Sequence, residues 1–169
     1  MPLTRIKSLG ITDGTIVNAD INASAGIVGT KLGTGAVLQV VTATDSTQRT
    51  TTSGSFVTAS NTLSVSITPS SASNKILILM TSGGGNNGTG TASYTVFRGA
   101  TNLGDGSNGF LSIQSNGGQI QSQVAVNFLD SPSTTSSTTY QVQFRASANT
   151  ATLNLNNNPG SITVMEIKG

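Results

Sequence analysis

A row of aliphatic residues, spaced about five apart, runs through the first 32 residues of this chain. An α-helix needs apolar residues three and four positions apart, and a half-buried strand needs them at every second position. Neither element explains the row, and Thr, Asp, Gly, Asn, Ala and Ser fill most of the intervals. The row consists of Ile6, Ile11, Ile16, Ile21, Ile27 and Leu32.

A chain that buries one side chain per short turn cannot form a core alone. We interpret residues 1–35 as an extended N-terminal arm or shaft, with the row on the axis of a symmetric oligomer. The alternative is an irregular arm whose Ile side chains insert into a neighbouring protein. In both cases the residues of the row are expected to make oligomer or anchor contacts.

The low charge of the chain narrows the fold class. Only 8% of its residues are charged, against roughly 25% in typical soluble domains. Val, Ile and Thr are plentiful, and these residues suit pleated, half-buried surfaces. We therefore expect an ordered all-β protein. A formal net charge of +2 also gives single copies little protection against association.

The composition excludes several kinds of chemistry. Without His or Cys the chain has no disulfide, no thiolate and no Ser-His-Asp arrangement. The eight basic and six acidic residues are scattered, unlike a nucleic-acid footprint or the paired carboxylates of a glycosidase. Neither a secretory signal nor a membrane span is evident. We expect no catalytic residue, cofactor, metal ion, nucleic acid or membrane insertion.

Residues 36–169 have the pattern of one antiparallel β-sandwich head, jelly-roll-like in its number of short strands. Residues 75–81 are apolar on both faces, which predicts a central strand covered on both sides. Runs of β character cover residues 37–44, 48–59, 63–67, 75–81, 92–98, 110–114, 120–129, 140–146, 151–155 and 161–168.

Two strand faces are polar but almost uncharged, around Gln123 to Asn127 and around Gln141 to Arg145. Such faces fit a wet subunit contact or a carbohydrate-facing surface, and the alternative is an ordinary solvated face. Glu166, the only Glu in the chain, is predicted to be a surface or edge charge paired with Lys or Arg.

Two glycine-rich segments are predicted to be turns. Residues 83–90 lack the Gly-Lys-Ser/Thr ending of a phosphate loop and are interpreted as a flexible hairpin tip. Residues 104–109 offer several oxygens, but one formal negative charge favours a plain turn over a calcium site.

Several strings of the sequence carry a resemblance. They are DGTIVNADINASAGIVGTKL, VLQVV, SFVTAS, LSVSITPSSASNKILILM, LDSPSTTSSTTYQVQF and SITVMEIKG. Together they resemble short tail-fibre and virion-associated proteins of tailed bacteriophages, particularly those of aquatic and cyanobacterial hosts. The resemblance implies a non-enzymatic, homotrimeric virion component with a head similar to the jelly rolls of tumour necrosis factor and complement proteins.

The expected function follows from this resemblance. The arm would attach the fibre to tail, baseplate or capsid proteins of the virion, and the head would bind a host-surface receptor such as a glycan. The alternative is a capsid decoration or cement protein with a purely structural role; a tailspike-type enzyme ranks third. The receptor loops are expected at residues 83–90, 102–110 and 131–139. The candidate receptor-facing residues are Asn86, Asn87, Tyr94, Asp105, Asn108 and Phe110.

The row itself is testable by substitution. Burial of an Ile side chain stabilises by roughly 1.5 to 3 kcal/mol, and an axial site repeats this gain in every subunit. Ile16→Asp would place like charges together on a dry axis. We expect limited proteolysis to cut the arm of Ile16→Asp faster than that of the wild type. Thr15→Asp, at a flanking polar position, should resist like the wild type; equal resistance of Ile16→Asp would contradict the axial role.

Overall fold

The structure is a computed structural model that describes residues 31–169. Ile6, Ile11, Ile16, Ile21 and Ile27 of the predicted row lie outside the described residues, so their axial position stays a prediction. Leu32, the last member of the row, is 37% exposed. The chain divides into two units, Met1–Leu32 and Gly33–Gly169. The second unit is the head, and it is described by itself below.

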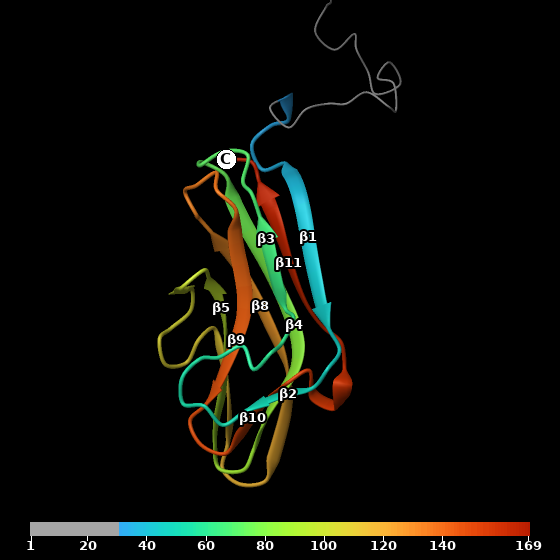
Figure 1. The fold of residues 1–169 in the computed structure, drawn as a ribbon, viewed down its shortest axis with the longest axis vertical. Helices are drawn as coiled ribbons and strands as arrows, with labels where there is room; N and C mark the ends of the chain where they lie inside the picture. Colours follow the sequence, from blue (N-terminus) through green and yellow to red (C-terminus); the bar gives the residue numbers. More distant parts are fainter. Residues whose placement is uncertain (1–30) are drawn as a thin grey trace, which may run out of the picture. The chain divides into compact units, whose positions relative to one another are not determined.

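The head is an all-β sandwich of two antiparallel sheets, as the alternating pattern predicts (Figure 1). The first sheet contains β1 (Val37–Asp45), β2 (Arg49–Thr51), β4 (Lys75–Asn87), β8 (Gln119–Asp130), β10 (Thr150–Leu153) and β11 (Gly160–Ile167). The second contains β3 (Ser64–Ile67), β5 (Gly90–Arg98), β6 (Thr101–Asn102), β7 (Leu111–Ser115) and β9 (Thr138–Ala146). A short 3-10 turn, η4 (Leu155–Asn157), precedes β11.

The strand order is that of a jelly roll. Hydrogen bonds join β1, β11, β4 and β8 in that order in one sheet, and β3, β9, β5 and β7 in the other. Apart from the hairpin between β5 and β7, each step along the chain through these eight strands crosses to the opposite sheet. This is the double-sheet closure that hides most strand edges of a jelly roll.

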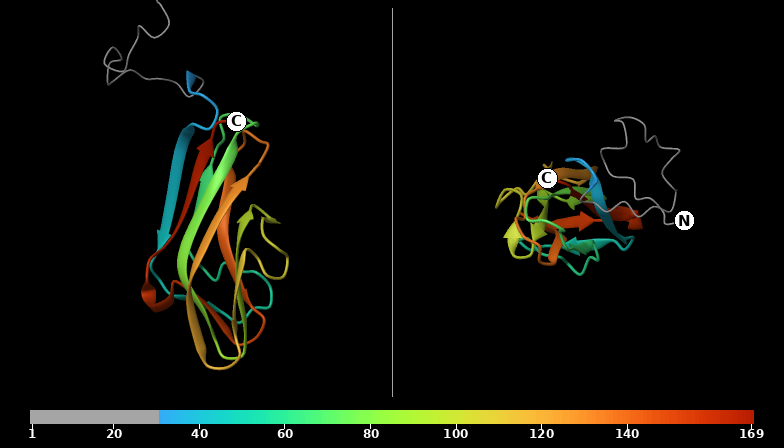
Figure 2. Two further views of the ribbon diagram at one scale, coloured as in Figure 1. Left: turned by 180° about the vertical axis from the view of Figure 1, so that it is seen from behind. Right: turned by 90° about the horizontal axis from the view of Figure 1, so that it is seen from above.

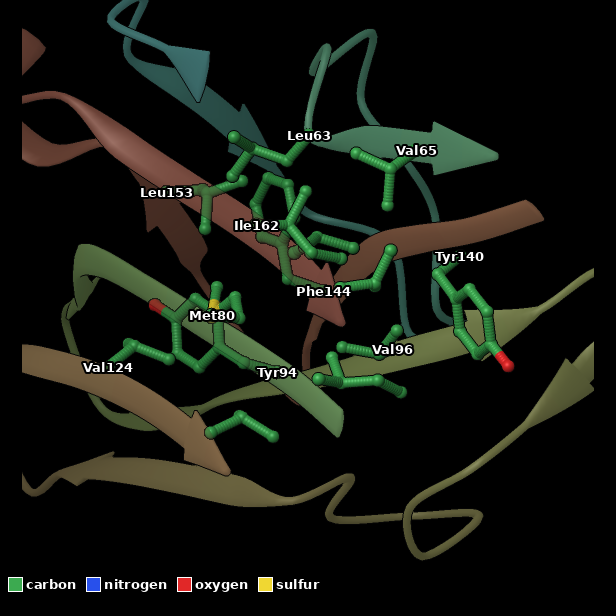
Figure 3. Packing of buried hydrophobic residues seen from close by; sticks show 14 of the residues in the cluster. Leu63, Val65, Met80, Tyr94, Val96, Val124, Tyr140, Phe144, Leu153 and Ile162 are labelled. Carbon is green, nitrogen blue, oxygen red and sulfur yellow. The ribbon is translucent and has the colours of Figure 1, made fainter. Parts of the chain in front are cut away.

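Alternating side chains of the two sheets meet in one core (Figure 3). Along β9 every second residue is buried, and the same holds for β11. The period of two places one face of each strand inside. The largest apolar side chains buried there are Leu63, Ile67, Ile76, Ile78, Met80, Tyr94, Val96, Tyr140, Phe144, Leu153 and Ile162.

Two predicted runs differ from the structure. Residues 75–81 do lie in a central strand, but only the inward face of β4 is buried, while Leu77 and Leu79 on its outward face are half-buried. Within a single head the outward face of this strand is therefore not fully covered. Residues 48–59 contribute only the three-residue strand β2 (Arg49–Thr51), because several Ser and Thr side chains there bond to nearby backbone instead.

A buried polar cluster ties the sheets together. Arg98 of β5 donates to both carboxylate oxygens of Asp130 at the end of β8, at 2.7 and 2.9 Å. The Tyr140 hydroxyl of β9 donates to the same carboxylate at 2.7 Å. Burial, together with the hydrogen bond to Asp130, raises the pKa of the Tyr140 hydroxyl. The hydroxyl therefore remains a proton donor, and the cluster fixes β8 against β5 and β9.

Glu166 is buried rather than at the surface, and its partners are uncharged. It is 1% exposed, and its carboxylate accepts hydrogen bonds from the side chains of Gln39, Ser70 and Asn74 and from the Ser70 N–H. The predicted pairing with Lys or Arg is therefore wrong. Burial raises the pKa of this carboxyl, but the four hydrogen bonds outweigh burial and hold the pKa below its usual value of 4.5. Glu166 thus anchors β1 and the β3–β4 loop to β11.

The lowered pKa has a consequence for acid stability. A carboxyl whose pKa is lowered by folding stabilises the fold above its unfolded pKa, and this stability is lost as the pH falls through the folded pKa. Glu166→Gln removes the charge and turns an NH₂ group towards donors, which should cost about 1 to 3 kcal/mol at pH 7. Thermal unfolding should show this difference in stability between the wild type and Glu166→Gln. The difference should become smaller as the pH is lowered below 4.5.

Asp105→Asn is the matched control. Asp105 is an exposed carboxylate that accepts two backbone N–H groups, and an amide oxygen can accept the same two. Its melting temperature should stay close to that of the wild type at pH 7. A Glu166→Gln protein with the wild-type melting temperature at pH 7 would show that the carboxylate does not hold the loop.

Candidate functional site

β4 runs the length of the head and defines its two ends. Its first residue, Lys75, lies opposite Ile167 of β11. The chain enters the head beside this point, where the Gly35 N–H donates to the carbonyl of Lys168 at 2.8 Å. We call this the proximal end. Asn87, the last residue of β4, lies at the opposite end (Figure 1).

Three short turns meet at this opposite end, and we call them together the distal tip. They are residues 87–90 between β4 and β5, residues 116–118 between β7 and β8, and residues 147–149 between β9 and β10. They come together because β4 pairs with both β8 and β10, so the ends of all three strands lie at one edge.

Hydrogen bonds between the turns hold the distal tip together. The Gly88 N–H donates to the carbonyl of Gly118 at 2.9 Å. The Asn149 amide donates to the carbonyl of Thr89, and the Thr91 N–H donates to the Ser147 hydroxyl at 2.9 Å. The three turns therefore form one connected surface.

Glycine is required where the turns approach each other. Gly88 has a φ of +118°, and a Cβ there would lie 2.8 Å from the side chain of Asn149. Gly90 has a φ of +153°, and a Cβ would lie 2.6 Å from the carbonyl oxygen of Ala148. L-residues rarely adopt these angles, so both the backbone and the space select glycine.

The distal tip is neutral. Residues 76–97, 111–129 and 146–165 contain no Asp, Glu, Lys, Arg or His. The cation nearest along the chain, Arg145, lies over the ring of Phe56, 5.8 Å from its centroid. The exposed groups of the turns are amides, hydroxyls and backbone. Such a surface can donate and accept hydrogen bonds without a charged group.

The structure separates the candidate receptor-facing residues. Asn87 is exposed at the distal tip, whereas Asn86 and Tyr94 are buried. Residues 83–87 are the last part of β4 rather than a flexible loop, because all of them pair with β8 and residues 84–87 also pair with β10. Alternation along the strand turns Asn86 inward, so predicting Asn86 and Tyr94 as receptor-facing was wrong.

Gly84 makes room for the buried Tyr94. Its hydroxyl accepts from the Gly85 N–H at 2.8 Å and donates to the Thr152 carbonyl at 2.6 Å. A Cβ at Gly84 would lie 2.7 Å from that hydroxyl. The ring is stacked on Phe144, with centroids 6.1 Å apart (Figure 3). Burial raises the pKa of the hydroxyl, which thus stays a donor.

Asp105, Asn108 and Phe110 belong to a loop that runs along the edge of β5 opposite β9. The Asp105 carboxylate accepts the N–H groups of Asn108 and Ser107 at 2.7 and 2.9 Å, and these bonds lower its pKa. Its oxygens therefore close a turn, as expected. Asp105 and Asn108 are exposed, while Phe110 is partly buried against Phe128, with centroids 5.0 Å apart. These residues lie away from the distal tip.

The third predicted receptor loop, residues 131–139, begins at the proximal end. It follows Asp130, which lies opposite Ile76 near the start of β4. The turns 116–118 and 147–149, in contrast, are distal and were not proposed as receptor loops. The turn at residues 116–118 could have been found from its sequence, because Asn116-Gly117-Gly118 is typical of a hairpin turn.

Within residues 31–169, no group of three or more His, Cys, Asp or Glu side chains could hold a metal ion. No helix in the same part of the chain is long and apolar enough to span a membrane. Neither a scan against protein-family models nor a search of curated proteins found a match to the chain.

The buried position of Tyr94 predicts a stability effect instead of a binding effect. Tyr94→Phe leaves the Gly85 N–H and the Thr152 carbonyl without their partner, which should cost about 1 to 3 kcal/mol. Asn87→Ala, at an exposed position, should change the free energy of unfolding by less than about 0.5 kcal/mol. Urea denaturation measures both, and the reverse order would contradict the interior position of Tyr94.

Proposed function

We propose that this chain is a structural fibre protein of a virion. It is a homotrimer that attaches to other virion proteins through its N-terminal arm and displays the distal tip to the host surface. The resemblance of the sequence to phage fibre proteins introduces this function. The observation that carries it further is the placement of the turns at the end of the head opposite the chain entry.

The geometry supports a display role. The chain enters the head at Gly35, and the three connected turns lie at the other end of the head. Exposed turns tolerate sequence changes with little loss of stability, so they can vary to fit different receptors. The C-terminal strand β11 returns to the proximal end, so both chain termini of the head lie away from the distal tip (Figure 2). Nothing in the backbone path of the head obstructs the tip.

The chemistry of the distal tip supports a neutral polar ligand. Sugar hydroxyls are recognised by amides and hydroxyls, which can donate and accept in one plane. The tip offers Asn87, Asn116, Ser147 and Asn149, and its turns contain no charged side chain. A neutral glycan of the host surface is therefore the receptor class that we propose.

A charge placed on the tip tests this role. Asn87→Asp combined with Asn116→Asp adds two carboxylates at exposed positions. Particles carrying this variant should adsorb to host cells at least about tenfold more weakly, since a loss of 1.4 kcal/mol in binding corresponds to a factor of ten. Adsorption kinetics measure the effect, and thermal unfolding should remain unchanged.

Ser137→Asp is the matched control, because Ser137 is exposed in the proximal loop. It should leave adsorption unchanged. If the tip variant is incorporated normally and adsorbs like the wild type, receptor binding by the tip is contradicted. The purely structural decoration role would then be the better account.

A further inference from the structure

The outer face of the first sheet carries an unbroken apolar row. The strand register places Val40 of β1 opposite Met165 of β11, Met165 opposite Leu77 of β4, and Leu77 opposite Leu129 of β8. Four neighbouring strands thus present one apolar side chain each, in adjacent register positions. We call this outer face of β1, β11, β4 and β8 the broad face.

The two ends of this row are the most exposed large apolar side chains among the described residues. Val40 is 53% exposed and Leu129 is 54% exposed. Val37, at the start of the same strand as Val40, is 49% exposed. Leu79 lies one row further along β4, beside Thr163 and Asn127. Monomeric proteins rarely expose contiguous apolar surface of this kind without a partner.

The broad face is also nearly free of charge. The acidic residues of its strands, Asp45, Asp130 and Glu166, are all buried. Lys75 is the one charged side chain at the outward positions of these four strands, and it lies at the proximal edge. Two copies of this face can therefore approach without like-charge repulsion across most of their area.

The size of the broad face suits association of copies. Four strands about 4.8 Å apart, paired over roughly eight residues of 3.3 Å each, cover about 500 Å² in projection. The accessible surface is larger than this projected area because the side chains protrude from it. The outward positions of β4 and β8 continue beyond this area towards the distal tip. A stable interface buries about 800 Å² per partner, so the whole face is of the right order.

We propose that the broad face is the contact surface between heads, and that its occupant is a second copy of this chain. The inference rests on the homotrimer of the proposed function and names the surface through which its heads meet. An apolar, uncharged face that is turned outward fits the heads of the other copies when the three faces are directed towards the axis of the homotrimer, whereas a charged partner would find no complementary group there.

The absence of cysteine from the chain permits a direct test. Val40→Cys and Leu129→Cys each place one thiol on the broad face in the full-length protein. Gln114→Cys places one on the exposed outer side of β7, in the other sheet, as the control. Maleimide labelling rates are measured over a range of protein concentrations, with native mass spectrometry reporting the number of copies at each concentration.

We expect the two broad-face thiols to react at least tenfold more slowly once copies assemble, while the Gln114→Cys thiol reacts at an unchanged rate. If assembled protein labels equally fast at all three positions, the copies associate elsewhere. That result overturns the broad face as the contact and leaves the homotrimer of the proposed function intact.

Other outcomes also decide the question. Protection of Val40→Cys and Leu129→Cys that is already complete in single copies would show that the chain's own N-terminal segment covers the face, which overturns the second copy as occupant. A protein that stays monomeric at every micromolar concentration would overturn both the inference and the proposed homotrimer. Protection of the control thiol would likewise contradict a contact limited to the broad face.

Discussion

The length of β4 is the constraint on which the head depends. Its 13 residues pair with β11 in the proximal half, with β10 in the distal half and with β8 throughout. In the distal half, Gly84 leaves room for the Tyr94 ring and hydroxyl, and Gly85 leaves room for the Ile120 carbonyl of β8. One continuous strand therefore sets the distance between the chain entry and the three distal turns.

Three acidic side chains of the described part of the chain lie inside the head. Asp130 binds Arg98 and Tyr140, and Glu166 gathers uncharged donors. Asp45 accepts the N–H groups of Thr47 and Thr62 as well as Arg49. Burial raises the pKa of Asp45, but these bonds outweigh burial and lower it. Because these three acids are buried, the broad face and the distal tip are almost neutral, which suits association and contact with neutral ligands.

The sandwich could be predicted from the sequence because the alternation of apolar and polar residues along a strand is recognisable even where one residue departs from it. The alternation of Val142 and Phe144 with polar neighbours was sufficient to orient β9. The pattern did not reveal that Gly83–Gly85 are paired, because a run of glycines is more typical of a turn than of a strand. Nor does a glycine indicate that the Tyr94 ring needs the space beside Gly84. Glu166 was misplaced for a related reason: its donors come from Gln39, Ser70 and Asn74, which are remote in sequence or lie in a loop.

We propose that the head points its distal tip away from the particle. Electron cryomicroscopy of intact virions containing the chain tests this most directly, because a head with distinct ends can be oriented in the density. We expect three heads around one axis, with their Gly35 ends towards the particle and residues 87–90, 116–118 and 147–149 outermost. Heads whose distal turns are buried against the particle would contradict this orientation.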